Sequence, residues 1–533
     1  MANLSSALLL PTLLQENALG QDPRAGLLNP AHLDPGMDMD PCGGYTTRPE
    51  KQFFFTDLRH IDPGDLSWRS IDGRPVPVAG PPEPPFEVRA DLGRVPRGIR
   101  MVAQKAIKEG PLPQGLPLVM IYDEGVYRGW DLDANYPEGK NLGSYSVALP
   151  ASISITYFES DNAIDWKVKG KTDVPVDNRT GIDGATFFID PHGPADERYK
   201  ALYNCSLPRE NKALIARFQA QYFKLHPHLR DTRLSVENEN MSCLYGLVSP
   251  DGISWKPIDE PLMMHHGDTH NMVYFDEWLG QYVLYTRLYW LRRRMIARAV
   301  SNDFRHWSPV RPIVMPSLDD PFSTDVYTNC RTTFPGAPNY HLMFPTFYHR
   351  YSQTSEIRLL SSFDGEVWDQ VPGDPVVEAG GPDHWSGEYI GVLGNMVPLG
   401  DERMALRLAA ASHPHKYPRW KGLIKNRTGW ATWRKGRLSA LVADEEGEFH
   451  TFGLTVTGRE LRVNARVWRA GDLRVGIQGN ENRTVELCDP IHGDSGTHVV
   501  TWKGDPLLGK SEGDTVVLHF KLRSAELFGF EFV

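Results

Sequence analysis

The sequence is poor in cysteine and in features that direct a protein to a membrane. Five cysteines are scattered along 533 residues, at Cys42, Cys205, Cys243, Cys330 and Cys488, and none of them forms a CxxC or other metal-ligand spacing. No apolar run reaches the roughly 18 residues that cross a bilayer. No basic segment precedes the short apolar run Leu8–Leu10, as it would in a secretory signal. We therefore expect a cytoplasmic protein with no membrane partner.

The sequence also lacks an excess of positive charge. Lys and Arg total 57 against 67 Asp and Glu, a formal net charge of −10. Nucleic acid is therefore not an expected partner, since binding to phosphates needs a basic patch. One basic cluster, Arg292–Arg294, follows an apolar stretch and fits a solvated strand end. A contact between this cluster and an anion at a site stays open.

A short pattern, Ser-x-(Asp/Asn)-x-x-x-Trp, occurs four times in the chain. The four copies run from Ser160 to Trp166, from Ser249 to Trp255, from Ser301 to Trp307 and from Ser362 to Trp368. In such a turn the Asp or Asn side chain accepts hydrogen bonds from backbone N–H groups two residues on. The next position tolerates an unusual φ, and the Trp packs back on the strands. The repeat therefore predicts a structural hairpin rather than a catalytic motif.

Strand-like segments flank the repeats in a constant order, which is typical of a four-stranded propeller blade. Four repeats and the strand-rich segment from Tyr389 to about Val442 predict an all-β fold with a five-bladed β-propeller over residues 51–443. Helical periodicity over residues 210–225 predicts a helix inserted in one blade. Residues 1–50 have no period and predict an irregular N-terminal arm. Residues 444–533 alternate without the repeat and predict a C-terminal β-sandwich.

Polar residues stand where the inner strands of successive blades are expected to begin. In a propeller these strand ends converge on one central funnel, although they are far apart in the sequence. Asp183 opens the expected inner strand of the second blade, Asp268 lies in the polar segment 265–271 before the third, and Glu388 precedes the fifth. Carboxylates that share a pocket can divide the roles of ionised base or nucleophile and protonated acid. We therefore predict Asp183, Asp268 and Glu388 as catalytic residues.

Further polar and aromatic side chains near the same strand ends are predicted to bind the substrate. Arg and His suit carboxylates or hydroxyls, whereas the face of Tyr or Trp stacks on a sugar ring. Packing between blades is the alternative role for each of them. The predicted substrate-binding residues are His266, Asn271, Arg287, Asp325, Tyr327, Arg331, His349 and Trp385.

Three histidines, His265, His266 and His270, surround Asp268 in the sequence. A shared metal ion is an alternative role for them, but neighbouring residues on a strand point to opposite faces, which hinders joint coordination. We expect no metal and no cofactor.

The Ser-x-Asp-x-x-x-Trp turns and the order of domains resemble those of the five-bladed propeller glycoside hydrolases of families 32, 43 and 68. The resemblance covers residue 115 to the end, and it is strongest to the family 32-like type with an appended β-sandwich. It implies a glycosidase acting on an oligosaccharide or glycoside. Asp268 would be base or nucleophile, Asp183 or Asp325 would stabilise the transition state, and Glu388 would be the acid.

The chain also departs from the family 32 pattern. It lacks a Trp-Met-Asn-Asp-Pro stretch, an Arg-Asp-Pro and a Glu-Cys pair, so fructan hydrolysis is not implied. The same turns occur in sialidase-like propellers.

Other functions on such a propeller stay open. A glycoside phosphorylase would need a cationic phosphate pocket, for which Arg287, Arg331, His349 and Arg292–Arg294 are candidates. A polysaccharide lyase would use His and Tyr on uronates. A non-catalytic carbohydrate-binding propeller would need neither Asp268 nor Glu388. The sugar, its linkage, the stereochemical outcome and the oligomeric state do not follow from the sequence.

Overall fold

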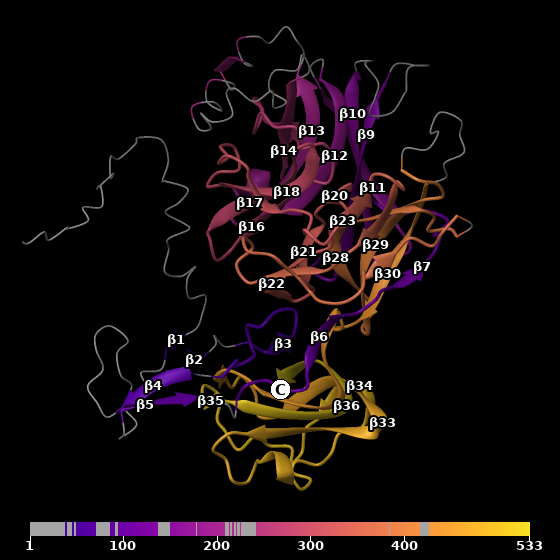
Figure 1. Cartoon of the computed structure of the whole chain (residues 1–533). Coiled ribbons are helices and arrows are strands. Elements are labelled where there is room, and N and C mark those ends of the chain that lie inside the picture. The colour runs from indigo at the N-terminus through magenta and orange to yellow at the C-terminus, as the bar shows by residue number, and fades with distance from the viewer. Residues whose placement is uncertain are drawn as a thin grey trace, which may run out of the picture.

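The computed structural model describes most of the chain after residue 94. Described are residues 38–39, 45–46, 50–64, 66–70, 86–90, 94–136, 150–176, 179–207, 213, 216–217, 220, 224, 241–382, 384–415 and 426–533. The N-terminal arm expected over 1–50 and the helix expected over 210–225 lie largely outside these residues. Figure 1 shows the propeller as the larger body, with the C-terminal sheet below it. The all-β fold expected from the sequence is confirmed.

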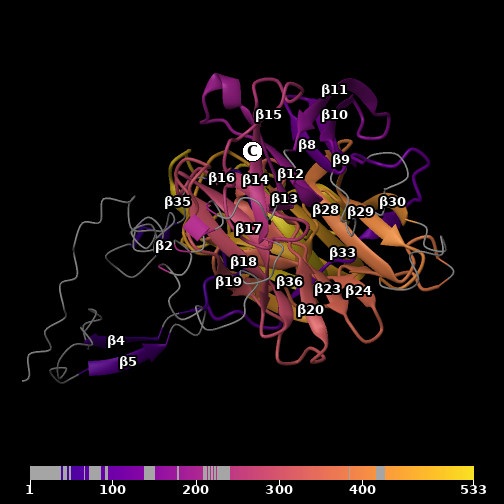
Figure 2. The ribbon, with the colours of Figure 1, turned by 90° about the horizontal axis from the view of Figure 1, so that it is seen from above.

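The larger body is a propeller of five blades, seen from above in Figure 2. Each of the first three blades is one antiparallel sheet of four strands in chain order, and the first strand of each blade lies innermost, against the first strand of a neighbouring blade. Blade I contains β8 (Val119–Asp123), β9 (Val126–Asn135), β10 (Ser152–Ser160) and β11 (Lys167–Pro175). Blade II contains β12 (Thr180–Ile189), β13 (Tyr199–Leu207), β14 (Met241–Ser249) and β15 (Lys256–Pro257). Blade III contains β16 (Met272–Asp276), β17 (Gln281–Trp290), β18 (Arg293–Ser301) and β19 (Arg311–Val314).

Blade IV is divided into two short sheets of four strands, and in each sheet the strands lie side by side in chain order. One contains β20 (Thr324–Thr328), β23 (Thr346–His349), β24 (Thr354–Ile357) and β27 (Val377–Glu378), and the other contains β21 (Arg331–Phe334), β22 (Ala337–Met343), β25 (Leu360–Ser362) and β26 (Asp369–Gln370). The inner strand is interrupted at Cys330, whose φ is 43°. The next strand is interrupted at Pro345, which has no N–H to donate to a ladder. These breaks separate the part of the blade that carries Asp325 from the part that carries Arg331.

Blade V closes the ring with a strand from the N-terminal part of the chain. Its strands are β28 (Tyr389–Leu399), β29 (Arg403–Ala411), β30 (Asn426–Arg434) and, at the outer edge, β7 (Ile107–Glu109). The register pairs Trp430 with Glu109 and Thr432 with Ile107. Because β7 precedes blade I in the sequence, this pairing joins the first and last blades and removes an open edge.

The four repeats form the hairpins between the third and fourth strands of blades I to IV. In each hairpin the Asp or Asn Oδ1 accepts the N–H two residues on, as Asp251 does from Ile253 at 2.8 Å. The next residue is left-handed in every copy, at Ala163, Gly252, Phe304 and Gly365 (φ 62°, 76°, 65° and 72°). The Trp Nε1–H donates to the carbonyl of that same residue. The predicted role of the repeat as a structural turn is confirmed.

The C-terminal β-sandwich contains a six-stranded sheet and a short second pair of strands. The sheet consists of β34 (Gly493–Val499), β33 (Leu461–Ile477), β36 (Leu518–Phe532), β31 (Ser439–His450) and β6 (Arg100–Ala103), and β3 (Gln52–Phe54) pairs with β36. β32 (Leu454–Thr455) pairs with β35 (Thr515–Val516). The structure also contains two 3-10 turns, η2 (Ala195–Glu197) and η5 (Val485–Leu487). Two further strand pairs are formed by β1 (Asp38–Met39) with β2 (Tyr45–Thr46) and by β4 (Leu66–Ser70) with β5 (Phe86–Ala90).

The strand pairing differs from the expected domain limits of 51–443 and 444–533. Residues 52–54 and 100–103 belong to the C-terminal sheet, and β31 already begins at Ser439. The physical reason is burial: Phe53 and Phe55 are fully buried in the C-terminal core, against residues such as Phe530. An apolar segment far upstream therefore completes the second domain.

Tyr340, on β22 of blade IV, links the propeller to the N-terminal segment. Its hydroxyl accepts the N–H of Phe54 at 3.1 Å and lies 2.7 Å from Nε2 of the buried His60. The ring of Phe54 stacks on Phe334 of blade IV with centroids 4.1 Å apart. Burial lowers the pKa of His60 to about 3, so this imidazole is neutral at pH 7.

Replacing Tyr340 by Phe should destabilise the protein because the buried N–H of Phe54 and the imidazole of His60 lose their partner. An unsatisfied buried polar group costs about 1–3 kcal/mol, so we expect a lower melting temperature. Thermal unfolding of Tyr340→Phe and of the control Tyr351→Phe, whose ring is 96% exposed, measures the effect. Equal melting temperatures for the two variants would contradict this account of the contact.

Candidate active site

Asp268 stands in a strained loop at the entrance of the blade III inner strand. Its φ is 52° and that of His270 is 61°, values that residues other than glycine seldom adopt. The side chain is 29% exposed, so the carboxylate is reachable from solvent. Oδ2 accepts hydrogen bonds from Arg287 Nη1 and from the Tyr289 hydroxyl, the latter at 2.6 Å. The loop therefore presents a carboxylate that two donors hold in place.

The charge of Asp268 is set by its neighbours on β17. Burial alone would raise the pKa of this carboxyl, but the Arg287 guanidinium and the Tyr289 hydrogen bond outweigh burial. The net pKa lies below the ordinary value of 3.8, so Asp268 is ionised at neutral pH. An ionised, partly exposed carboxylate is suited to act as a base or a nucleophile.

Arg287 connects blade III to blade IV. Its guanidinium is almost completely buried, and its Nε donates to the Tyr327 carbonyl of β20 at 2.9 Å. It also lies 4.0 Å from the centroid of the Tyr327 ring. These contacts with Tyr327 fix the position of the Arg287 guanidinium, whose positive charge pairs with Asp268.

Asp325, at the start of the blade IV inner strand, has no exposed surface and binds two further arginines. It accepts the backbone N–H of Arg294 at 3.0 Å, Nη1 of Arg294 at 2.7 Å and Nη2 of Arg350 at 2.8 Å. Its carboxylate therefore positions Arg294 and Arg350 rather than facing a ligand directly.

The histidines around Asp268 contact separate partners. His265 Nε2 lies 2.7 Å from the Arg287 carbonyl, and His266 Nδ1 lies 2.8 Å from Ser242 Oγ. His266 also stacks on Tyr289, with ring centroids 5.1 Å apart. Burial lowers the pKa of His265 to about 4 and that of His270 to about 3. These two rings are therefore neutral at pH 7.

In the part of the chain that the structure describes, no group of three His, Cys, Asp or Glu side chains is placed to hold a metal ion.

Asp183 lies in an irregular stretch of β12 next to the Asp268 loop. The pairing of β12 with β13 shifts on both sides of Asp183. The following residue, Gly184, has φ 62° and sits so close to the loop that a Cβ there would lie 2.6 Å from Thr269 Cα. The structure thus brings Asp183 and Asp268 into adjacent backbone segments. Asp183 also lies beside Tyr136, whose pKa is raised first by burial and then by the Asp183 charge.

Glu388 is half-buried at the start of the blade V inner strand, beside an aromatic cluster. The next residue, Tyr389, stacks on His415 at 4.2 Å, and His415 Nε2 lies 2.8 Å from the Tyr327 hydroxyl. Since Tyr327 also binds Arg287, a continuous set of contacts runs from Asp268 through blade IV to the residue beside Glu388.

Asn271 and His349 belong to the supporting structure around these strand ends. Asn271 is fully buried and accepts the Thr286 hydroxyl at 2.6 Å. His349 pairs in register with Thr324 and lies 3.7 Å from Glu356.

Two predicted site residues are placed elsewhere. Arg331 lies beyond the break in the blade IV inner strand, where it covers the Tyr274 ring at 3.3 Å and contacts His341 at 2.9 Å. Trp385 packs over Gly110 and Gly429, on the outer strands of blade V. Arg331 is separated from the start of the inner strand by the break at Cys330, and the side chain of Trp385 turns toward the outer strands of its blade.

Tyr289, Arg294 and Arg350 contact the site but were missed as individual site residues in the sequence. In the sequence Arg294 stands out only as part of the basic cluster Arg292–Arg294. A usable signal exists for Tyr289, because it follows Arg287 by two positions on the same strand and therefore points to the same face.

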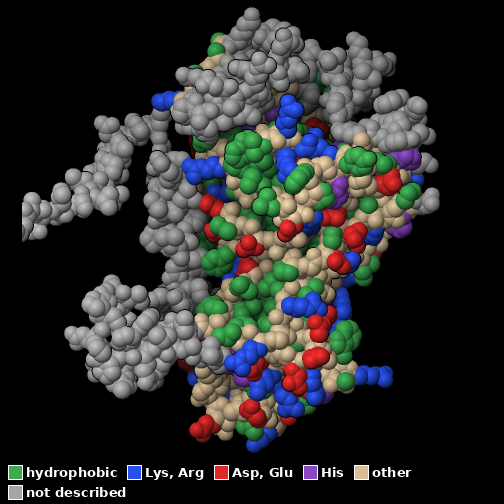
Figure 3. All heavy atoms as spheres, in the orientation of Figure 1, with side chains coloured by type: hydrophobic (Ala, Val, Ile, Leu, Met, Phe, Trp, Pro, Cys, Tyr) green, Lys and Arg blue, Asp and Glu red, His purple; other side chains and the backbone are tan. Residues whose placement is uncertain are grey.

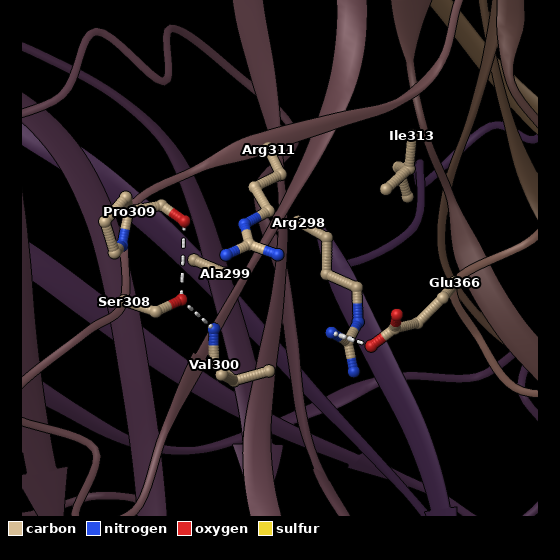
Figure 4. A pocket seen from close by; sticks show the side chains of 8 residues that line it. All are labelled: Arg298, Ala299, Val300, Ser308, Pro309, Arg311, Ile313 and Glu366. Atoms are coloured by element: carbon tan, nitrogen blue, oxygen red, sulfur yellow. Dashed lines mark hydrogen bonds and ion pairs between the residues drawn. The ribbon is translucent and has the colours of Figure 1, made fainter. Parts of the chain in front are cut away.

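A shallow pocket lies away from this site, at the outer part of blade III. Figure 4 shows it between Arg298, Arg311 and Glu366, with Arg298 Nη1 2.6 Å from the Glu366 carboxylate. None of the predicted site residues lines it. The face in Figure 3 carries charges of both signs among apolar side chains, without a broad basic band.

Comparisons with known proteins found similarity in solved structures alone. No family model matches the sequence, and no curated protein matches it. The similar solved structures are glycoside hydrolases of families 32 and 43 and related proteins, in agreement with the resemblance expected from the sequence.

Three of these structures cover most of the chain. An exo-inulinase from Aspergillus awamori is 11% identical and has a TM-score of 0.35, covering 81% of this chain and 98% of its own. A β-fructofuranosidase from Bombyx mori is 12% identical with a TM-score of 0.35, covering 82% and 94%. A family 43 arabinoxylan arabinofuranohydrolase from Bacillus subtilis is 10% identical with a TM-score of 0.33, covering 80% and 99%. Because the sequence identities and TM-scores are this low, the three structures do not indicate which reaction this protein catalyses.

Replacing Gly184 by Ala should displace the Asp268 loop because the new methyl group would lie too close to Thr269. Gly280→Ala is the matched control: its φ is 60°, but a Cβ there has open space. Both variants bear the left-handed strain of about 1–2 kcal/mol, and we expect a clearly lower melting temperature for Gly184→Ala. If Gly280→Ala is destabilised as much, the close approach of the two loops is not supported.

Proposed function

We propose that the protein is a glycoside hydrolase whose site lies at the mouth of blades II to V, with Asp268 as nucleophile or base. The observation that carries the proposal is the state of this carboxylate: partly exposed, ionised, and held through one oxygen by Arg287 and Tyr289. Among the described residues both hydrogen bonds go to Oδ2, which leaves Oδ1 for a ligand. A structural carboxylate such as Asp325, by contrast, is buried and has both oxygens bonded.

The other carboxylates supply the remaining roles in the proposal. Glu388, directly before the inner strand of blade V, would donate a proton to the leaving oxygen as the glycosidic bond breaks. Asp268 would either attack the anomeric carbon or take a proton from the attacking water. Asp183, next to the Asp268 loop, would stabilise the positive charge that develops on the sugar ring. His266 and Tyr289 form a stacked pair beside Asp268 that would bind sugar hydroxyls.

The proposal also covers the cellular location of the enzyme and its need for a cofactor. No helix among the described residues is long and apolar enough to cross a membrane. Cys205, Cys243, Cys330 and Cys488 are free and buried. We propose that the enzyme works in the cytoplasm without a cofactor, and cell fractionation tests the location.

Asp268→Asn should remove at least about 99.9% of turnover, since an amide can neither attack nor accept a proton. The measurement uses purified parent and variant with pyranosidic and furanosidic aryl glycosides and oligosaccharides. Asp319→Asn is the control, because Asp319 is an exposed turn residue of the same charge.

Equal turnover by Asp268→Asn and the parent would reject the assignment of Asp268. No turnover of any substrate by the parent would favour the carbohydrate-binding propeller. Turnover that requires phosphate, or an unsaturated product, would favour a phosphorylase or a lyase.

The pH profile should report the ionisation of Asp268. Since its pKa is lowered, kcat/KM should hold down to acidic pH and fall only as pH drops through the lowered pKa. Tyr289→Phe removes a hydrogen bond to the ionised form, which should raise that pKa and move the acid limb to higher pH. Tyr122→Phe, an exposed tyrosine near the C-terminal end of β8 in blade I, should leave the limb in place. An unmoved limb in Tyr289→Phe would mean that another group controls it.

A further inference from the structure

Arg294 and Arg350 meet on the carboxylate of Asp325 at the mouth of blades III and IV. Arg294 lies 5.3 Å from the centroid of the Tyr289 ring, whose hydroxyl binds Asp268. Arg350 reaches the same place from the end of blade IV, where its Nη2 donates to Asp325 and to the Arg292 carbonyl. Both side chains are partly exposed, with 21% and 38% of their surfaces accessible. Arg294 therefore lies near the proposed catalytic carboxylate, and Arg350 joins Arg294 on their shared partner Asp325.

The charges of this group do not cancel. The guanidinium groups of Arg287, Arg294 and Arg350 face two carboxylates, Asp268 and Asp325. The hydrogen bonds of Asp325 already use both of its oxygens, so it cannot neutralise a further cation. One positive charge is left over in a partly dry site, where attraction to an anion is stronger than in water.

The same two arginines also have donors without acceptors. Nε of Arg294 and Nε of Arg350 are buried and have no hydrogen-bond partner among the described residues. Native structures leave few such atoms unpaired, and Nε of Arg298, Arg331 and Arg462 belongs to the same small group in this structure. A guanidinium group binds a carboxylate or phosphate through two parallel N–H groups, and both side chains keep part of their surface accessible to such a ligand.

The turn that precedes Arg294 adds an aromatic surface at the rim. Leu291 and Arg292 are both left-handed, with φ of 51° and 58°, although neither is Gly or Asn. Strain of this kind persists where the surroundings impose it. The turn follows Trp290, which is 40% exposed and pairs in register with Arg293. Such a ring can stack on a sugar beside the arginines.

We propose that Arg294 and Arg350 form an oxyanion subsite, and that the substrate of the proposed glycosidase is an acidic carbohydrate whose carboxylate binds there. This inference rests on the proposed function for the position of the cleaved bond, but the binding itself does not depend on hydrolysis. Free phosphate has the same chemistry and is the second source of an oxyanion.

Binding of uronate oligosaccharides and of their methyl esters tests the subsite directly. The two probes share sugar and linkage and differ in charge. Calorimetric titration of the full chain, in its Asp268→Asn form to prevent turnover, should show at least about tenfold weaker binding of the ester. Adding Arg350→Gln or Arg294→Gln should weaken binding of the acid by a similar factor and leave the ester unchanged. Adding Arg311→Gln, an exposed arginine on the outer part of blade III, should change neither.

The outcomes separate the subsite from the proposed reaction. Equal binding of acid and ester, or binding of acid that survives loss of both arginines, would overturn the subsite. The same holds if neither the uronate probes nor inorganic phosphate bind. Arginine-dependent binding of inorganic phosphate, with turnover that requires it, would place phosphate rather than a carboxylate in the subsite. Turnover of neutral glycosides that needs Asp268 but not the arginines would keep the glycosidase and reject the subsite.

Discussion

The buried guanidinium of Arg287 is the contact on which the site depends. It joins the entrance loop of blade III, through Asp268, to the inner strand of blade IV, through the Tyr327 carbonyl. A buried cation that lost its carboxylate would cost about 3–5 kcal/mol, so Arg287 and Asp268 hold each other in place. The same contact keeps Asp268 ionised. One interaction therefore sets both the position and the charge of the carboxylate proposed for catalysis.

Backbone strain is concentrated around this contact. Asp268 and His270 enter blade III with left-handed backbones, Leu291 and Arg292 turn between β17 and β18 at the same end of the blade, and Cys330 breaks the strand that carries Asp325. Each conformation costs energy that the surrounding sheets must offset. The repeat turns contain Ala163 and Phe304 in the same conformation, but there a complete set of local hydrogen bonds supports it. At the site the same conformation occurs in the loop that carries Asp268 and in the turn that precedes Arg294.

Local patterns in the sequence predicted the blades well, and long-range contacts explain what was missed. The repeat turns were predictable because each is stabilised within seven residues, from its Ser to its Trp. Asp183, Asp268 and Glu388 do stand at inner-strand starts, as the alternation of strands indicated. The role of Arg350 depends on Asp325 and Arg292, far away in sequence, so no local pattern reveals it. The pairing of β3 and β6 with the C-terminal sheet is equally remote.

A crystal structure of the Asp268→Asn protein with a bound uronate oligosaccharide tests the central claim most directly. The account predicts a glycosidic bond beside residue 268, with a sugar carboxylate within hydrogen-bond distance of Arg294 and Arg350. A ligand bound at another surface of the propeller or on the C-terminal β-sandwich, with the mouth of blades III and IV empty, would contradict it.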